Sequence, residues 1–562
     1  MTKLSGKKNR TSALDRVYEY HDRTKHHLQR YARALGYLDW ANQPDPFRRY
    51  EQSLTLTLEH PQISATPTYD ALFNIPQGPA EPVNRNSISR FFYESLAISA
   101  WKQAGNSRWS LRVNPSSGDL HPTEAYLIAG TIKEISAAAA VYHYSPHQHA
   151  LERRVLLTHE EWAALCQGLL PGSLLIALTS IYWRESWKYG ERAFRYCQHD
   201  AGHAIGTLTF AAAALGWETR LIHSVADNDL SLLTGIAQQD GIEAEHPDCL
   251  LVAYPADASV TASVLEVNLP DTLLERLKTM QFEGRPNKLS EDHHEWPIID
   301  AIAEACRFNN LGTDLRHKPG TDASWVPSPL YAVAVDRKIS ARKIIRQRRS
   351  AVAMDGQSTI SRETFYRMMT HVSPHPANRI LNVLPWQPHV ALALFIHRVE
   401  DMPTGLYLLA RDSRHEPSLK QSLSPGFHWA KPAACPEPLH LYLLQEGDFR
   451  AAARTICCHQ NIAADGAFAL GMLAEFDAGL EQYGASFYPR LFWETGLIGQ
   501  ILYLEAEAAG IRSTGIGCFF DDTMHEILGI GDHGWQSLYH FTVGGAVDDP
   551  RLQTLPAYWY LK

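Results

Sequence analysis

Two stretches of the chain decide its fold: DAGHAIGTLTFAAAALG, from Asp200 to Gly216, and ETGLIGQILYLEAEAAG, from Glu494 to Gly510. Each is rich in small and apolar residues over about four helical turns and ends at a glycine, which accepts the left-handed conformation at a helix C-terminus. A shift of 294 positions (494 − 200) superimposes them without a gap. The same register pairs further residues of the two copies: Gly202 with Gly496, Leu208 with Leu502, Ala212 with Ala506, Asp227 with Asp521, and Gly235 with Gly529.

This register predicts that one domain has been duplicated. The alternative, a chance likeness between two alanine-rich helices, does not explain why the match continues into the loop glycines. Helices that are apolar on all sides, alternating with short strands such as LLVAY (250–254), indicate an α+β domain with a helix-covered sheet. Two such copies would pack as an internal pseudo-dimer, and a crevice lined by both copies is a common cofactor site.

A segment rich in proline, glycine and charge separates the two copies, with one short helix predicted near 298–308. The segment before the first copy holds many aromatic and cationic residues suited to a lid or a docking arm. We therefore predict four parts: an N-terminal extension (1–80), a first domain (81–270), a linker (271–330) and a second domain (331–562).

Composition excludes several classes of function. The 562 residues carry a formal net charge of −9, so a nucleic-acid partner is not expected. The eight cysteines are scattered without a C-x-x-C pair, which favours a reducing compartment. No apolar run approaches the ~18 residues that span a bilayer, and no apolar stretch follows the basic N-terminus. We expect a cytoplasmic protein without a membrane partner.

Three polar segments are candidates for ligand binding. Pro115-Ser116-Ser117-Gly118 forms a turn whose N–H groups and hydroxyls can point at one ligand, although taken alone the four residues favour a plain tight turn. Arg348-Arg349-Ser350 can grip a dianion through bidentate bonds, or can be a solvated basic turn. Gly515 and Gly517 would let backbone approach a flat ring or a phosphate.

Two other patterns are set aside. Gly529-x-Gly531-x-x-Gly534 follows a helical segment and precedes a strand, the reverse of the order in a dinucleotide-binding motif. The histidines at 143–149 and 293–294 have no third ligand at a suitable spacing, so we interpret them as solvent-exposed loop residues and predict no metal site.

Four segments, taken in order and spacing, resemble the nitroreductase superfamily and in particular its azoline-oxidase-like branch. They are RVNPSSGDLHPTEAYL (112–127), IYWRESWKYGERAFRYCQHDAGHAIG (181–206), RRSAVAMDG (348–356) and ETGLIGQILYLEAEAAGIRSTGIGCFFDD (494–522). The resemblance spans both halves, so it implies two tandem nitroreductase-like domains.

The resemblance implies that FMN binds between the two domains. Nitroreductase-like domains take an Arg/Ser segment and a late glycine and basic segment from one protomer and a Pro-Ser loop from the other. The matching positions here are Arg348, Arg349 and Ser350; Gly515, Gly517 and Arg551; and Pro115, Ser116, Ser117 and Gly118. Val352 stands where many relatives have a further arginine, which leaves the phosphate contacts less complete.

A second, symmetry-related site would be degraded. It would need Arg85, Ser87 and Arg90 from the first half with a loop of the second, where Pro385-Trp386-Gln387-Pro388 has no serine. The first half also lacks the Gly-x-Gly after Gly216. One FMN per chain is therefore expected.

Lys188 and Tyr189 resemble the Lys-Tyr pair proposed as the base of azoline oxidases; alternatively they only pack among the neighbouring aromatic and cationic residues. The resemblance thus implies an FMN-dependent oxidoreductase that dehydrogenates a modified peptide or a related small substrate, converting azoline to azole. One alternative is an NAD(P)H-dependent nitro or quinone reductase. Another is a non-catalytic flavin- or peptide-binding subunit of a biosynthetic complex. The sequence leaves open whether the fused pair dimerises again.

Overall fold

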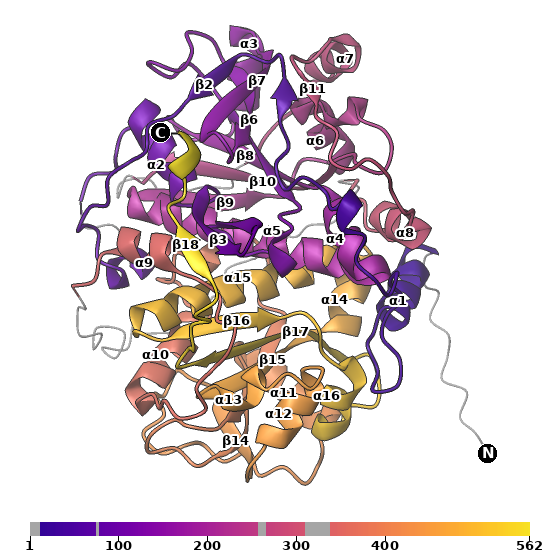
Figure 1. Ribbon diagram of the computed structural model, residues 1–562, viewed down its shortest axis with the longest axis vertical. Coiled ribbons are helices and arrows are strands. Elements are labelled where there is room, and N and C mark those ends of the chain that lie inside the picture. Colours follow the sequence, from indigo (N-terminus) through magenta and orange to yellow (C-terminus); the bar gives the residue numbers. More distant parts are fainter. Residues whose placement is uncertain (1–11, 75–77, 257–265, 310–337, 562) are drawn as a thin grey trace.

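The computed structural model describes residues 12–74, 78–256, 266–309 and 338–561. In this part of the chain two sheets lie at opposite ends of the molecule, and two long helices lie side by side between them (Figure 1). The upper sheet in Figure 1 comes from the first half of the chain and the lower sheet from the second. This arrangement confirms the predicted α+β class and the internal pseudo-dimer.

The two sheets are antiparallel and share one strand order. In the first, the order is β2 (Thr55–Thr57), β7 (Ala150–Leu156), β6 (Ala140–Ser145), β5 (Thr123–Ala129), β8 (Leu174–Ser180), β10 (His246–Pro255), β9 (Trp217–Ile222). In the second it is β14 (Leu441–Glu446), β13 (Gly405–Leu409), β12 (Val390–Ile396), β15 (Phe468–Glu475), β17 (Trp535–Gly544), β16 (Arg512–Ile516). Apart from β2, the strands correspond one to one, as duplication of a domain requires.

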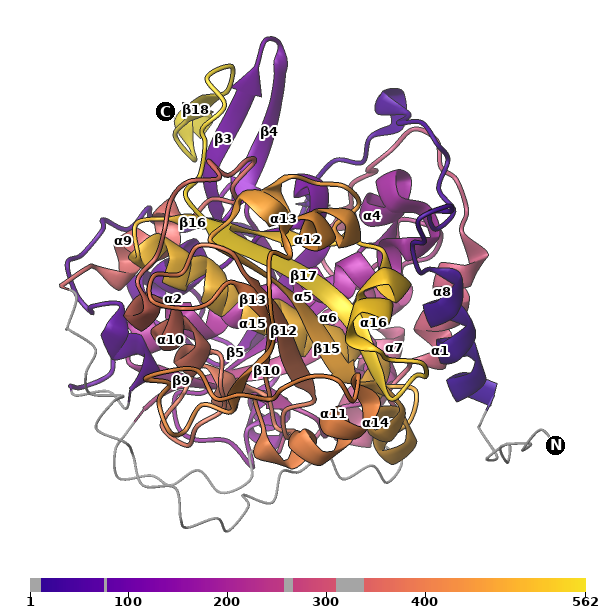
Figure 2. The same ribbon diagram turned by 90° about the horizontal axis from the view of Figure 1, so that it is seen from below.

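Helices cover these sheets, and Figure 2 shows the second sheet with its helices from below. Those of the first half are α2 (Arg85–Tyr93), α3 (His159–Leu165), α4 (Tyr182–Tyr189), α5 (Ala193–Ala214), α6 (Asp227–Thr234), α7 (Asp271–Thr279) and α8 (Pro297–Ala305). Those of the second half are α9 (Ala341–Gln347), α10 (Arg362–His371), α11 (Glu416–Ser422), α12 (Arg450–Ile456), α13 (Ile462–Asp465), α14 (Phe476–Tyr483), α15 (Phe487–Ala508) and α16 (Asp521–Leu528). No helix in the described ranges is both long and apolar enough to cross a membrane.

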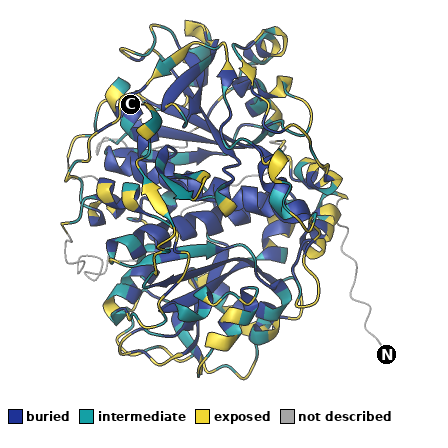
Figure 3. Cartoon of the chain, viewed as in Figure 1, coloured by how far each residue is buried: buried dark blue, intermediate teal, exposed yellow. Residues whose placement is uncertain are grey.

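The central helices α5 and α15 are buried along almost their whole length (Figure 3). The glycines predicted to end them, Gly216 and Gly510, have φ values of 74° and 75°. The helices cross where Gly202 meets Gly496: a Cβ atom added to Gly202 would lie 2.9 Å from the Cα atom of Gly496. Because the repeat register pairs these two glycines with each other, the crossing lies on the pseudo-twofold axis, and glycine is required because the two backbones touch there.

Both ends of the chain tie the halves together. Helix α1 (Ser12–Arg23) contacts the second half through Tyr18, whose hydroxyl donates to Asp477, and the following residues run on to a backbone bridge between His26 and Phe520. At the other end, β18 (Gln553–Leu555) crosses back to the hairpin of β3 (Ile98–Ala104) and β4 (Ser107–Arg112) in the first half (Figure 1). A further two-stranded sheet joins β1 (Tyr50–Glu51) to β11 (Arg285–Pro286).

The predicted boundaries of the four parts stay predictions. Residues 310–330 of the expected linker, 1–11 and 75–77 of the N-terminal extension and 257–265 of the first domain lie outside the described residues.

The interpretation of the histidines as exposed loop residues is wrong for two of them. His143, in β6, is fully buried between the carboxylates of Glu124 and Glu152, which raise its pKa to about 9 against the effect of burial. His149, in the turn directly before β7, is also fully buried. Residues 142–149 form the end of β6 and the turn to β7, and Tyr142 to Ser145 are all buried, which their polar composition concealed.

Candidate functional site

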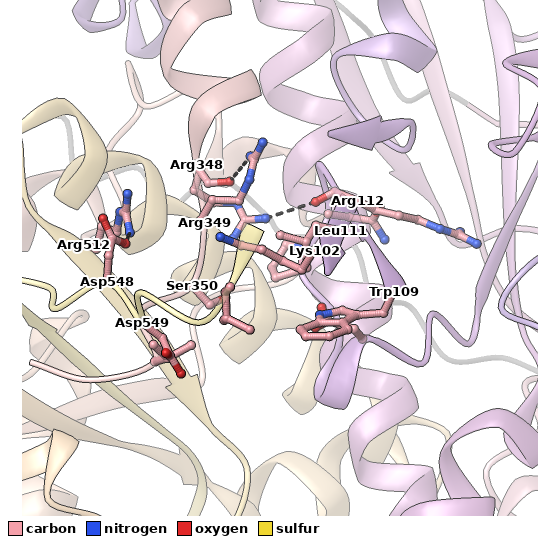
Figure 4. A pocket seen from close by; sticks show the side chains of 15 residues that line it. Lys102, Trp109, Leu111, Arg112, Arg348, Arg349, Ser350, Arg512, Asp548 and Asp549 are labelled. Atoms are coloured by element: carbon pink, nitrogen blue, oxygen red, sulfur yellow. Dashed lines mark hydrogen bonds and ion pairs between the residues drawn. The ribbon is translucent and has the colours of Figure 1, made fainter. Parts of the chain in front are cut away.

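The predicted binding segments of the two halves line two adjoining cavities. The first, shown in Figure 4, is lined among others by Lys102, Arg112, Pro115, Asp119, Arg348, Arg349, Ser350 and Arg512. The second, of about 290 Å³, is lined among others by Pro115, Ser116, Ser117, Gly118, Asp119, Tyr189, Asp200, Ser350, Gly515, Gly517 and Cys518. Three residues, Pro115, Asp119 and Ser350, border both. The Pro-Ser turn, the Arg-Arg-Ser segment and the two glycines therefore meet at one place.

The first cavity is rich in positive charge. Five cationic side chains and only three carboxyl groups line it, and two of those carboxyl groups are bound to arginines, Asp548 by Arg512 and Asp549 by Arg551. Arg348 is buried, and its Nε atom has no hydrogen-bond partner among the residues that the structure describes. Burial and the neighbouring Arg348 lower the pKa of Arg349 to about 10. Such an excess of positive charge, part of it buried, favours an anionic ligand.

Arg551 does not reach this cavity. Its side chain is 84% exposed and forms an ion pair with Asp549 in the same turn. Lys102 and Arg512 lie at the cavity instead, and neither was among the residues predicted from the sequence. Lys102 is brought there by the β3–β4 hairpin, so no local motif marks it.

Tyr503 of α15 joins the two binding segments of the second half. Its hydroxyl lies 3.0 Å from Ser350 Oγ and accepts a hydrogen bond from the Gly515 N–H at 2.9 Å. Ser350 also forms a parallel backbone bridge with Ser513. The Arg-Arg-Ser segment is thus fixed against the strand that carries the glycines.

The two glycines are required by the protein itself. A Cβ atom added at Gly515 would lie 1.8 Å from the hydroxyl of Tyr539, and one at Gly517 would lie 2.2 Å from the ring of Tyr196. The expectation that their small size admits a ligand is therefore modified, because tyrosine side chains occupy the space that a Cβ atom would need. Both glycines still line the second cavity with their backbone.

Two buried carboxyl groups, Asp200 and Glu185, and the half-buried Asp119 lie around the serine turn. Asp200, on α5, accepts hydrogen bonds from the N–H and the hydroxyl of Ser117, and burial raises its pKa to about 7. Burial likewise raises the pKa of Asp119 to about 6. Both carboxyl oxygens of Glu185 lack a hydrogen-bond partner within the described ranges, and burial followed by the charge of Asp200 raises its pKa well above the ordinary value. Perturbed acids grouped at a cavity are a feature of functional sites.

Lys188 and Tyr189, at the end of α4, lie beside this turn. A Cβ atom added at Gly118 would be 2.6 Å from the Tyr189 hydroxyl and 2.8 Å from Lys188 Nζ. Gly118 has a φ of 65°, so the turn needs glycine for its conformation as well as for this close approach. Burial raises the pKa of Tyr189 well above its ordinary value, so its hydroxyl keeps its proton.

Sequence reasoning did not select several residues of the second cavity. His203 lies 3.1 Å from the Tyr539 hydroxyl through Nε2, and burial lowers its pKa to about 3, which leaves the ring neutral. Asp200 was used only to align the repeat. The signal that could have identified both is the occurrence of polar side chains on a helix that is buried on every side, because buried polar groups need partners or a function.

These residues fit FMN. Arg348, Arg349, Ser350 and the neighbouring Lys102 and Arg512 supply cationic and hydroxyl donors for a phosphate, and the unpartnered Nε of Arg348 is one donor still available. The adjoining cavity offers tyrosine rings, the Ser116–Gly118 turn and strand backbone to a flat polar ring.

The residues predicted for the degraded second site serve another purpose. Arg85 donates to the Thr57 carbonyl and pairs with Glu59, and Arg90 donates to the Gln62 carbonyl, so both bind the N-terminal extension. Ser87 forms the capping box of α2 with Asn84.

Comparison with known proteins identifies the class. The profile described as "Nitroreductase family" matches residues 86–252 and 427–545, which together make up just over half of the chain. The chain therefore belongs to the nitroreductase family of FMN-dependent oxidoreductases, with one matched segment in each half.

Two relatives bear the name "putative nitroreductase". The one from Methanocaldococcus jannaschii is 22% identical over 183 residues, which cover 31% of this chain and 88% of the relative. The crystal structure from Anabaena variabilis superimposes with a TM-score of 0.66 at 21% identity, covering 95% of this chain and 99% of that one. The second likeness shows that the whole two-domain fold is shared.

Proposed function

We propose that the chain binds one FMN across the two cavities and dehydrogenates a carbon–nitrogen bond of a modified peptide or a related small substrate. The observation that carries this proposal is the meeting of Arg348, Arg349 and Ser350 from one half with the Ser116–Gly118 turn from the other. Bound FMN would accept the hydride in such a reaction. The cationic cavity would hold its phosphate, while the tyrosine-lined cavity would orient its ring.

The side chains beside the turn would manage the proton that leaves the substrate. Tyr189 would orient the substrate as a hydrogen-bond donor, and Lys188 Nζ would accept the proton in concert with the neighbouring carboxyl groups. Asp119 lines both cavities, and its pKa of about 6 makes it a carboxylate that can share a proton near neutral pH. Loss of a positioned acid–base group typically costs about 10²- to 10⁴-fold in rate.

The test replaces the lysine. Lys188→Met should keep bound flavin and lower the turnover of an azoline-containing peptide by at least about 100-fold. Lys133→Met, at an exposed turn of the first domain, is the matched control and should retain the wild-type rate. Wild-type turnover by the Lys188 variant would refute the role of this lysine. A purified protein that takes up no FMN would refute the proposed cofactor site.

A second candidate is an NAD(P)H-dependent reductase of nitro compounds or quinones, which the names of both relatives favour. Bleaching of the flavin spectrum by NADPH or NADH in the absence of oxygen would support it. Resistance to both nucleotides, together with azoline oxidation, would support the dehydrogenase. Bound flavin that reacts in neither assay would favour a non-catalytic subunit.

A further inference from the structure

Two cysteines that are distant in sequence meet at the wall of the second cavity. Cys518 follows β16 and lines the cavity next to Gly517. Cys458 follows α12, and the two sulfur atoms lie 2.7 Å apart. A disulfide bond is about 2.0 Å long, so bond formation needs a movement of less than about 1 Å. Both residues are half-buried, and the proposed FMN contacts and proton transfer use neither thiol.

The two segments that carry these sulfurs are clamped together. Gln460 donates through its side-chain amide to the Cys518 carbonyl at 3.2 Å, and the Phe520 N–H donates to the Ile456 carbonyl at 2.7 Å. Cys458 itself has a φ of 53°, a conformation that non-glycine residues rarely adopt. A strained backbone held by two flanking hydrogen bonds keeps the sulfurs adjacent.

Cys518 is placed to react as the thiolate. The His26 ring accepts a hydrogen bond from the Ala32 N–H through Nδ1, so its proton is on the other ring nitrogen, which faces Cys518 as a donor. The Cys458 thiol, His26 and the charge of Arg192 lower the pKa of Cys518 to about 5 against the effect of burial. The pKa of Cys458 is raised, first by its bond to Cys518 and then by burial.

The other six cysteines differ in this respect. Burial raises the pKa of all six thiols. Even in the half-buried Cys166 and Cys435 the pKa is raised to about 11. A low-pKa thiol at a cavity with a resolving partner is the arrangement of a redox site, whereas a buried thiol without one is inert.

We propose that Cys458 and Cys518, both half-buried, form a redox-active dithiol that reacts with small disulfides from solvent. The Cys518 thiolate attacks one sulfur of R–S–S–R, the S–S bond breaks, and one thiolate RS⁻ leaves and takes a proton from water. Cys458 then gives its proton to solvent and attacks Cys518, which forms the protein disulfide and releases the second RS⁻. The two protein thiols are oxidised and the small disulfide is reduced to two thiols, independently of any flavin.

The test uses the full-length protein in buffers of reduced and oxidised glutathione. After alkylation of free thiols, peptide mass spectrometry should show a Cys458–Cys518 disulfide that forms and reopens with the buffer. Cys458→Ser should trap glutathione on Cys518, and Cys518→Ser should leave Cys458 unmodified. Cys166→Ser, which changes a half-buried cysteine outside the pair, should form the disulfide like the wild type.

A kinetic measurement covers the case in which a variant fails to fold. In the wild-type protein at pH 7, iodoacetamide should alkylate Cys518 at least about tenfold faster than Cys166, because only the thiolate is nucleophilic. Equal rates, glutathione trapped on Cys458 in place of Cys518, or a pair that is permanently oxidised or never oxidised across the buffer series would each overturn the proposal.

Discussion

Asp200 and Glu494 occupy the same position in the two copies of the repeat, yet their surroundings are opposite. Asp200 faces the second cavity, holds the serine turn, and has its pKa raised to about 7 by burial. Glu494 is equally buried, but it forms an ion pair with Arg411 and accepts a hydrogen bond from the His389 N–H. One acid serves a cavity, whereas the other is neutralised as part of the core.

Other pairs of positions in the repeat show the same contrast between a cavity residue and a core residue. The register places Leu221 opposite Gly515 and Leu497 opposite His203. Both leucines belong to the hydrophobic core, with exposures of 4% and 0%. At each of these positions one half lines the cavity, whereas the other half contributes a core leucine or a buried ion pair. Function in such a pseudo-dimer therefore depends on side chains that break the symmetry of a shared scaffold.

The largest expected effect concerns the cationic cavity. Replacing Arg348 and Arg349 together by Gln should weaken FMN binding about a thousandfold, or about 4 kcal/mol, because each charge-assisted bond is worth about 1.5–3 kcal/mol. Fluorescence titration with FMN would measure this. The matched control is the double change of Arg85 and Arg90 to Gln in the other half, which should leave FMN affinity unchanged. If both pairs weakened binding equally, the comparison between the two sides would fail.

The next prediction concerns the core acid. Glu494→Gln leaves Arg411 buried without a counter-charge, so the free energy of unfolding should fall by about 3 kcal/mol or more, measured by urea denaturation at pH 7. Asp200→Asn removes no ion pair and should not destabilise the protein at that pH. A loss of the same size in both variants would contradict the different roles assigned to the two acids.

A smaller effect depends on pH. The folded-state pKa of Asp200, about 7, exceeds the unfolded value of about 3.9, so between pH 5 and pH 6 the folded protein binds a proton that the unfolded chain has released. Stability should therefore fall as pH rises, by about 1 kcal/mol over that unit, relative to Asp200→Asn. Urea denaturation of both proteins at the two pH values measures this difference, and parallel values would rule out a raised pKa at Asp200.

The smallest effect is expected at Arg551. Because its side chain is exposed and paired with Asp549, Arg551→Ala should change FMN affinity by less than about twofold. Arg512→Ala, at the cavity itself, should weaken binding more. A large loss on changing Arg551 would show that this turn closes over the phosphate, as the family resemblance implies.

Much of the architecture could be predicted from local signals. The glycine that ends each central helix and the order of helix before strand around Gly529 both depend on residues close in sequence, and the structure confirms them. The segments that line the two cavities were also selected, because turns and arginine pairs are contiguous in sequence. Lys102 and His203 were not selected, because only tertiary packing brings them to the cavities.

By itself the sequence determined that one α+β domain is repeated and that the cationic segment and the Pro-Ser turn belong to different halves. Only the tertiary structure decided which acid stays without a counter-charge, which glycines face tyrosine rings, and that Cys458 lies against Cys518. The physical reason is the separation in sequence between the residues that interact. Helix caps and hydrophobic periodicity are properties of neighbouring residues, whereas the pKa of a buried carboxyl group or the approach of two sulfurs depends on contacts between distant parts of the chain.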